Sequence, residues 1–210
     1  MASTCHVSLF QLVAISLSLL VYSPPTAAAQ YAPFPSPMEE TASEDAPPKL
    51  VEEVCNRSGV SEFCVEALES DPRTASAPDL LSIAKIALDL AKTNATSTRN
   101  YIDGMLKRDD TKPALRPALE KCASSYELVF ASFSSAHDEL EEDPMTANYD
   151  ALIAGDYISS CDEELSSGGV SVPSISAKNQ VMMYFVRIGD TVTDLLRTNV
   201  DLSFPSSSHQ

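Results

Sequence analysis

The 210-residue chain has few of the residues on which catalysis, metal binding and nucleic-acid binding depend. It contains 3 histidines, 6 glycines and 14 Lys or Arg residues against 30 Asp or Glu residues, so its formal charge is −16. No histidine pair has the spacing of metal ligands, and no glycine-rich loop could hold a phosphate. The acidity disfavours nucleic acids and anionic membrane surfaces, whose phosphates would repel the protein. We therefore expect no cofactor, and the charge favours a cationic partner or serves solubility alone.

The sequence also offers no clear set of catalytic residues. Beyond the N-terminal segment the histidines are His209, in the tail, and His137, beside the acidic run Asp138–Asp143. A hydrolase needs a nucleophile, a base and an orienting partner, and no such set is evident. The acidic run lacks the central glycine of a calcium loop. Among 30 acidic residues some carboxylates will lie close together, as in glycosidases, but nothing singles out one pair. We expect that the protein is not an enzyme and has no small-molecule substrate.

The N-terminal segment, residues 1–29, has the layout of a secretory signal peptide. It holds no Asp, Glu, Lys or Arg, its residues 7–22 are largely apolar, and small residues at 27–29 suit cleavage before Gln30. The alternative is a membrane anchor, but the apolar run is short for a span of about 20 residues. No other stretch is apolar enough to cross a bilayer. We therefore expect a secreted, extracellular protein that does not bind a membrane.

Composition divides the rest of the chain into three parts. Residues 30–48 contain five prolines and four acidic residues, which predicts a flexible lead-in with little to bury. Residues 49–203 are enough for one compact domain. The tail, residues 204–210, is expected to be flexible.

The domain contains four stretches in which apolar residues recur at alternating spacings of three and four. This spacing places one apolar stripe on each of four helices, and no stretch alternates with a period of two for long enough to predict a strand. The four stripes comprise Leu81, Ala84, Leu88, Ala91, Ala95, Thr98, Ile102 and Met105; Leu115, Leu119, Cys122, Tyr126, Val129, Phe133, Ala136 and Leu140; Ala147, Ala151, Ala154, Ile158, Cys161 and Leu165; and Val181, Phe185, Ile188, Val192 and Leu195.

Residues that start and stop helices separate these stripes. Ser76–Asp79 resembles a capping box before the first long helix, Pro113 and Pro117 suit the first turn of the second, and Asp143–Pro144 suits the start of the third. Gly168–Gly169 would end the third helix. Because the connections are short, we predict an all-α fold: an up-down-up-down four-helix bundle over about 77–201, preceded by a short helical hairpin over about 49–73.

Four cysteines remain after the signal peptide, which allows two disulfides in three connectivities. Cys122 and Cys161 lie on the stripes of consecutive helices, about 30 Å and about 27 Å from the turn between them at 1.5 Å per residue. Antiparallel packing would bring their sulfurs to the same height, so we predict Cys122–Cys161, which leaves Cys55 to pair with Cys64 and close the hairpin. The alternative, free buried thiols, fits an exported protein poorly.

Two Asn-X-Ser/Thr motifs could accept a glycan. Asn56 lies in the expected turn between the hairpin helices, where it would be accessible. Asn94 borders the apolar stripe of the first long helix. Because the motif is short, an unused motif is the alternative at both positions.

Three sequence features resemble the plant invertase and pectin methylesterase inhibitor family, and in particular its pollen-allergen-like branch. The first is the spacing Cys55-x8-Cys64 followed by EALESDPRTASAPDL. The second is ALEKCASSYELV around Cys122, and the third is YDALIAGDYISSCDEEL around Cys161. The resemblance covers residues 49–200. It implies a secreted, disulfide-linked four-helix bundle of the plant apoplast or cell wall, with disulfides that join the first cysteine to the second and the third to the fourth.

The resemblance also implies a function in binding. Family members occlude the active-site cleft of pectin methylesterase or of cell-wall or vacuolar invertase, expected here as a 1:1 complex. In invertase inhibitors a Pro-Lys-Phe motif precedes the second bundle helix. The corresponding residues here are Thr111, Lys112, Pro113 and Ala114, so the order is altered and the aromatic residue is missing. This difference favours pectin methylesterase as the target and leaves invertase as the alternative.

The acidic run supplies a second set of candidate contacts, Glu139, Glu141, Glu142 and Asp143. Carboxylates that meet a basic enzyme would have lowered pKa values in the complex, so binding would weaken as the pH falls through those values. The alternative is a solvated acidic cap on the bundle. A third interpretation of the whole protein is a helical bundle that carries a small apolar ligand, although stripes that mix alanine with leucine and phenylalanine suit close packing.

Overall fold

The computed structural model describes residues 47–167, 169 and 171–203. The expected signal peptide (1–29), residues 30–46 of the lead-in and the expected tail (204–210) lie outside the described residues.

The described residues form helices and no strand. Two short helices, α1 (Pro47–Arg57) and α2 (Ser61–Glu69), are followed by the 3-10 turn η1 (Pro72–Ser76). The long helices are α3 (Leu80–Leu106), α4 (Arg116–Glu139), α5 (Pro144–Ser167) and α6 (Pro173–Ser203), with the 3-10 turn η2 (Pro113–Leu115) directly before α4. Helix α1 begins two residues earlier than the sequence predicted, since proline is tolerated in a first helical turn.

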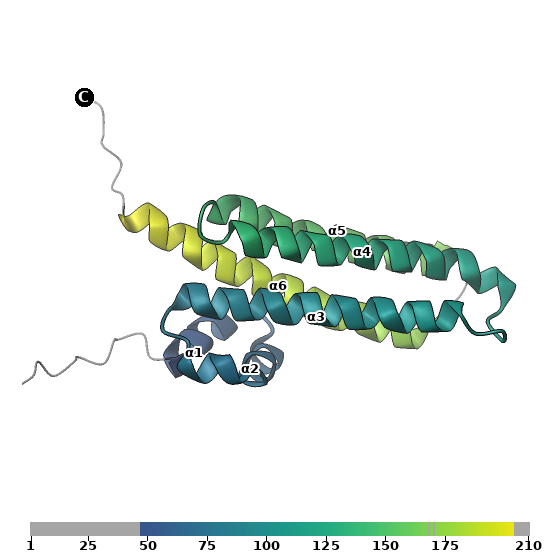
Figure 1. Ribbon diagram of the computed structural model, residues 1–210, viewed down its shortest axis with the longest axis horizontal. Helices are drawn as coiled ribbons and strands as arrows, with labels where there is room; N and C mark the ends of the chain where they lie inside the picture. The colour runs from purple at the N-terminus through teal and green to yellow at the C-terminus, as the bar shows by residue number, and fades with distance from the viewer. Residues whose placement is uncertain (1–46, 168, 170, 204–210) are drawn as a thin grey trace, which may run out of the picture. The chain divides into compact units, whose positions relative to one another are not determined.

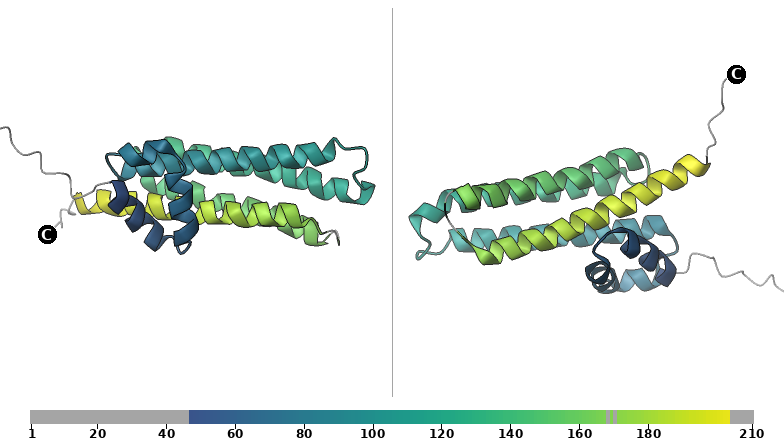
Figure 2. Two further views of the ribbon diagram at one scale, coloured as in Figure 1. Left: turned by 90° about the horizontal axis from the view of Figure 1, so that it is seen from below. Right: turned by 180° about the vertical axis from the view of Figure 1, so that it is seen from behind.

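The four long helices lie side by side, and successive helices run in opposite directions (Figures 1 and 2). α4 packs against α3 and α5, and α6 completes the bundle by packing against α5 and α3. The hairpin of α1 and α2 packs against α3 and α6. The predicted all-α, up-down-up-down bundle with a preceding hairpin is therefore confirmed.

The predicted apolar stripes form the core between these helices. All six stripe residues of α5 are buried, from Ala147 to Leu165, as are Leu119 to Leu140 on the second stripe. Only the end residues Leu81, Met105, Leu115 and Val181 are partly exposed. The three-four spacing therefore identified the buried face of every long helix.

The start of α5 agrees with the sequence prediction, whereas the start of α3 differs from it. The Asp143 carboxylate accepts hydrogen bonds from the backbone N–H groups of Met145 and Thr146, so it caps α5 as predicted. The expected capping box at Ser76 is wrong. The carboxylate of Asp79 caps α3 by accepting from the backbone N–H of Ser82 at 2.8 Å, whereas Ser76 ends η1. Serine and aspartate are both favoured caps at the start of a helix, which is why the motif was ambiguous.

Two disulfides hold the domain together, and they join the pairs that the helix lengths predict. Cys55–Cys64 closes the α1–α2 hairpin, with Cα atoms 5.3 Å apart. Cys122–Cys161 joins α4 to α5, with Cα atoms 4.5 Å apart. Because Cys122 lies near the start of α4 and Cys161 near the end of α5, this second disulfide clamps one end of the bundle.

A buried polar network lies beside Cys161. Tyr126 on α4 donates its hydroxyl to the Asn179 amide oxygen on α6 at 2.6 Å, and the Asn179 amide donates to Asp162 on α5 at 2.6 Å. Burial raises the pKa of Tyr126 far above its ordinary value, so the phenol stays protonated as a donor. The network ties three helices together at the end that the disulfide clamps.

The middle of the bundle is narrow where α6 carries Gly189. A Cβ atom built there would lie 3.3 Å from Ala151 Cβ and 3.4 Å from side-chain atoms of Leu88 and Phe133. The absence of a side chain therefore lets α6 approach α5 and α3 closely. At this level the core leaves no space for an apolar ligand, which argues against the carrier interpretation.

Candidate partner-binding surfaces at the two ends of the bundle

The two sets of predicted contact residues lie at opposite ends of α4 (Figures 1 and 2). Residues 111–114 precede α4. Glu139 is the last residue of α4, and Glu141, Glu142 and Asp143 follow it. The 24 residues of α4 separate these ends by about 36 Å at 1.5 Å per residue. We call residues 107–115 with 169 and 171 the connection end, and residues 138–143 with the start of α5 the turn end. A partner would therefore need an interface about 36 Å long to contact both sets.

The acidic residues of the turn end have different roles. Asp143 is committed to capping α5, because its carboxylate also accepts the Thr146 hydroxyl at 2.7 Å. Hydrogen bonds from the Thr146 hydroxyl and from the Thr146 and Met145 backbone N–H groups lower the Asp143 pKa. Glu141 forms an ion pair with Lys85 on α3. Glu142 is exposed and Glu139 is partly exposed. Of the four predicted contacts, Glu139 and Glu142 are therefore the most available to a partner.

Apolar side chains continue the turn end along α5. Met145, Tyr149 and Leu152 are 66%, 62% and 45% exposed. Their spacing of four and three residues places them on one face of the helix, opposite the buried stripe. The sequence did not single out these residues, because only their exposure in the folded protein distinguishes them from core positions. They form an apolar strip, defined as Met145, Tyr149 and Leu152, that begins beside five acidic residues at 138–143.

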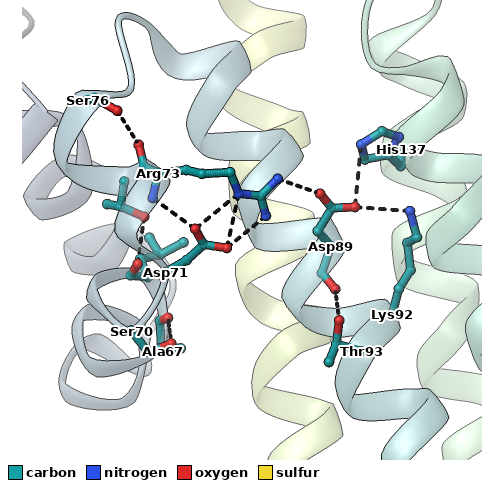
Figure 3. Close-up of polar contacts among 11 residues, drawn as sticks. Ala67, Ser70, Asp71, Arg73, Ser76, Asp89, Lys92, Thr93 and His137 are labelled. Atoms are coloured by element: carbon teal, nitrogen blue, oxygen red, sulfur yellow. Dashed lines mark hydrogen bonds and ion pairs between the residues drawn. The ribbon is translucent and has the colours of Figure 1, made fainter. Parts of the chain in front are cut away.

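A cluster of charged residues near the turn end fixes the end of the hairpin to the bundle (Figure 3). Arg73 on η1 donates to Asp71 at 2.7 Å and to Asp89 on α3 at 3.0 Å. Lys92, one turn further along α3, donates to the other oxygen of Asp89 at 3.0 Å. His137 on α4 places its Nε2 atom 3.7 Å from the same oxygen. Asp89 thus lies at the centre of nitrogen-bearing side chains from three elements, η1, α3 and α4.

The surroundings of Asp89 hold its carboxylate in the charged form. Partial burial opposes ionisation, but hydrogen bonds from Lys92 and Arg73 outweigh burial and lower the Asp89 pKa. Asp71 also has a lowered pKa, chiefly because it accepts hydrogen bonds from the Arg73 side chain and backbone. The cluster joins residues 66 positions apart in sequence, so no local motif could have revealed it.

The connection end is held by backbone contacts. The Thr111 hydroxyl donates to the Met105 carbonyl at 2.5 Å, and Arg116 donates to the Leu106 carbonyl at 3.0 Å. Arg108 and Asp110 form a two-bond ion pair at 2.8 and 2.7 Å. Lys112, Pro113 and Ala114 take no part in these hydrogen bonds through their side chains, and all three residues are exposed. The predicted contact residues therefore form a supported, accessible loop.

An open depression of about 720 Å³ lies at the connection end. Its wall comes from the end of α3, the loop before α4, and residues 169 and 171 between α5 and α6. The lining includes Asn100, Tyr101, Arg108, Asp110, Thr111 and Lys112, together with Gly169 and Ser171. The Tyr101 side chain is anchored, because its hydroxyl donates to Ser174 at 2.8 Å and the Lys178 ammonium lies 4.9 Å from its ring centroid.

The two glycosylation motifs differ in exposure. Asn56 is exposed, but it lies in the last turn of α1 and not in the turn that the sequence suggested. Asn94 is partly buried in the middle of α3, at the border of the stripe. Glycan attachment at either residue stays a prediction, and Asn56 is the more accessible acceptor.

Within residues 47–167, 169 and 171–203, no three His, Cys, Asp or Glu side chains are arranged to hold a metal ion. In the same part of the chain, no helix combines the length and the apolar character needed to cross a membrane.

A model of the plant invertase/pectin methylesterase inhibitor family matches residues 49–191, and the chain belongs to this family. Members of the family are proteinaceous inhibitors and not enzymes. The helical fold and the two disulfides agree with that class.

The chain is similar to inhibitors with two different targets. It is 34% identical over 113 residues to "Cell wall / vacuolar inhibitor of fructosidase 2" from Arabidopsis thaliana. These residues cover 53% of this chain and 62% of the relative. The match therefore spans less than two thirds of that relative. It is also 30% identical over 142 residues to a "Pectinesterase inhibitor" from Actinidia deliciosa, covering 67% of this chain and 75% of the relative.

Solved structures of pectin methylesterase inhibitors from Arabidopsis share the fold. One, a mutant form, matches with a TM-score of 0.59 at 19% identity, covering 68% of this chain and 93% of that structure. Another matches with a TM-score of 0.52 at 20% identity, covering 70% and 96%. At these identities the likeness establishes the helical architecture.

Proposed function

We propose that the protein is exported to the plant cell wall, where it binds a pectin methylesterase and occludes its active-site cleft in a 1:1 complex. The observation that carries this proposal is the similarity to a pectinesterase inhibitor along 75% of that protein's length. The missing aromatic residue at Thr111–Ala114 supports the same target over invertase. Export is supported by the two disulfides, which fit an oxidising compartment.

The turn end is the surface that best suits such a partner. Protein interfaces commonly have an apolar or aromatic centre with a polar rim. The apolar strip provides the centre, with Tyr149 and Met145 most exposed, and the acidic residues 138–143 provide a rim of one sign. A basic enzyme would be steered to this rim and would bury the strip. Aromatic and methionine side chains are typical anchors, and a good anchor contributes about 2 kcal/mol or more.

The discriminating experiment titrates the secreted protein against a plant pectin methylesterase and against an acid invertase. We expect saturable inhibition of the pectin methylesterase with one inhibitor per enzyme, read from tight-binding curves. Inhibition of invertase alone would transfer the function to the alternative target. Failure to inhibit several isoforms of either enzyme would overturn the proposal.

The surface is tested by the double substitution Met145→Ser with Tyr149→Ser. Because both side chains are exposed, the fold should be preserved while the inhibition constant rises by about 30-fold or more, the equivalent of one strong anchor. The matched control is Phe130→Ser on α4, which is 41% exposed and lines a different surface beside Lys92 and Thr93. Equal losses in both variants would show that exposed apolar residues act without regard to position and would exclude the turn end as the specific surface.

Invertase inhibition is the second candidate because a specific observation favours it. The chain is 34% identical to an inhibitor of fructosidase, which is higher than its 30% identity to the pectinesterase inhibitor. Lys112 and Pro113 are exposed and directly precede α4, although their order is reversed relative to the family motif. If this target is correct, Lys112→Ala with Pro113→Ala should weaken invertase inhibition while the substitutions at Met145 and Tyr149 leave it unchanged.

A further inference from the structure

We propose that the depression at the connection end binds an anionic oligosaccharide whose sugar rings carry carboxylates, such as a short oligogalacturonate. The site would attach the inhibitor to an acidic wall polysaccharide independently of its enzyme target. The proposal does not rest on the proposed function, because it concerns the end of the bundle opposite the apolar strip.

Local charge allows an anion to approach this end of an otherwise acidic protein. Residues 99–121 contain six Lys or Arg residues and four Asp or Glu residues, a net charge of +2 in a chain of −16. The acidic run at 138–143 lies about 36 Å away along α4. The Debye length at physiological ionic strength is about 8 Å, so repulsion from the turn end is screened. The acidic residues at 162–164 lie on α5 and do not line the depression.

The lining offers one available cation and a fixed pair of opposite charges. The Arg108 guanidinium is already neutralised by Asp110, and Arg116 is occupied by the backbone carbonyls of the loop. Lys112 is exposed and lines the depression, so its ammonium is the natural partner of a sugar carboxylate. A site with one available ammonium and a neutralised ion pair in its wall suits a singly charged sugar carboxylate better than phosphate or sulfate, and the Asp110 oxygens can also accept sugar hydroxyls.

The remaining lining suits a sugar ring in shape and polarity. Tyr101 is 39% exposed, and its ring is held in place by Ser174 and Lys178. An anchored aromatic ring can pack against the apolar C–H face of a sugar at little cost in side-chain entropy. Asn100 and Thr111 add neutral hydrogen-bonding groups to the lining. A volume of about 720 Å³ has room for more than one sugar unit.

The test measures binding of a galacturonate oligomer of defined length to the secreted full chain by calorimetry, at low and at physiological ionic strength. We expect saturable binding that weakens with salt, and no comparable binding of the fully methyl-esterified oligomer, which is uncharged. Absence of saturable binding at low ionic strength, or equal binding of the ester, would overturn the proposal. Equal binding of a polyglutamate peptide of the same charge would also overturn it, because the surface would then select charge and not sugar.

Two substitutions locate the site. Lys112→Gln should weaken binding by up to about fivefold, the range of an exposed ion pair. Its matched control is Lys85→Gln at the turn end, which removes the same charge and should change binding less than twofold. Tyr101→Ala should weaken binding by about tenfold, by analogy with bases that stack on aromatic side chains, and Tyr101→Phe should retain most of the affinity. Equal effects at Lys112 and Lys85, with melting temperatures unchanged, would exclude a localised site.

Discussion

The two ends of the bundle are held by different forces. The connection end has the Cys122–Cys161 disulfide and the buried Tyr126–Asn179–Asp162 network beside it. The turn end has the Lys85–Glu141 ion pair and the charged cluster around Asp89, both at or near the surface. One end is therefore fixed by a covalent bond and buried donors, and the other depends on ionised carboxylates. Stability at the turn end should therefore respond to pH more strongly than stability at the connection end, where the disulfide does not titrate.

This difference matches the proposed roles of the ends. A surface that meets a basic enzyme must keep its carboxylates charged, and nearby carboxylates, Asp71 and Asp89, attach the end of the hairpin to α3 through Arg73. Neutralising both groups of carboxylates would affect binding and local structure together. The connection end, whose stability depends less on charge, can hold a small depression in a fixed shape.

The largest expected effect comes from breaking the connection end. Replacing Cys122 and Cys161 by serine removes a constraint on a loop of 39 residues and should lower the free energy of unfolding by about 4 kcal/mol in the chain-entropy model. Denaturant unfolding measures the loss. Hydrogen exchange should rise first in the start of α4 and the end of α5.

The matched control replaces Cys55 and Cys64, which close a loop with a separation of 9 residues. The same model gives about 2.7 kcal/mol, with faster exchange confined to the hairpin. If the two double variants lost equal stability and exchanged in the same helices, the disulfides would not act on separate regions, and the comparison of the ends would be wrong.

An intermediate effect is expected from Asp89→Asn at the turn end. The substitution removes the charge that Arg73, Lys92 and His137 face, and should cost about 1–2 kcal/mol at neutral pH. Because the pKa of Asp89 is lowered in the folded protein, its contribution is fully present above the ordinary value of about 3.9 and is lost as the pH falls through the lower folded value. The difference in Tm between wild type and variant should therefore be constant above about pH 5 and close below about pH 4.

Asp109→Asn is the control for that experiment. Asp109 is exposed in the loop at the connection end, and neutralising it should leave the Tm nearly unchanged at every pH. A pH-independent loss in Asp89→Asn would mean that the side chain acts through packing alone, and the ionic description of the turn end would fail.

The smallest effect is expected at the cap of α5. Asp143→Ala removes the acceptor of the Met145 and Thr146 backbone N–H groups and should lower the Tm by less than Asp89→Asn does. Asp143→Asn keeps an acceptor and should retain most of the stability. Thermal melts of the three proteins give the comparison. If Asp143→Asn were as damaging as Asp143→Ala, charge at the helix start would matter more than the hydrogen bonds.

The fold was predictable because its signals are local or follow from helix length. The three-four spacing identified the stripes, and the rise per residue in a helix placed Cys122 opposite Cys161. The start of α3 was assigned to Ser76 instead of Asp79, because both residue types cap helices and the choice depends on where η1 ends.

The candidate surfaces were only partly predictable. The acidic run and the loop at Thr111–Ala114 were recognised, but their separation to opposite ends follows from the direction of α4. The ion pair that occupies Glu141 comes from Lys85, 56 residues earlier, and the contacts of Asp89 come from η1 and α4. The exposure of Met145 and Tyr149 depends on which side of α5 the other helices cover. Such long-range relations have no signature in a single sequence.

The glycine at position 189 bears on how this architecture could acquire a different role. Any larger residue there would have to push α6 outward by a few tenths of an ångström or more, because Ala151, Leu88 and Phe133 already fill the space that its side chain would need. Because the larger side chain would itself occupy the added space, such a change alone would not make room for a guest molecule, which would need smaller residues in place of Leu88 or Phe133. The missing side chain at one crossing point thus keeps the bundle solid, and a container would have to be carved from the residues that surround it.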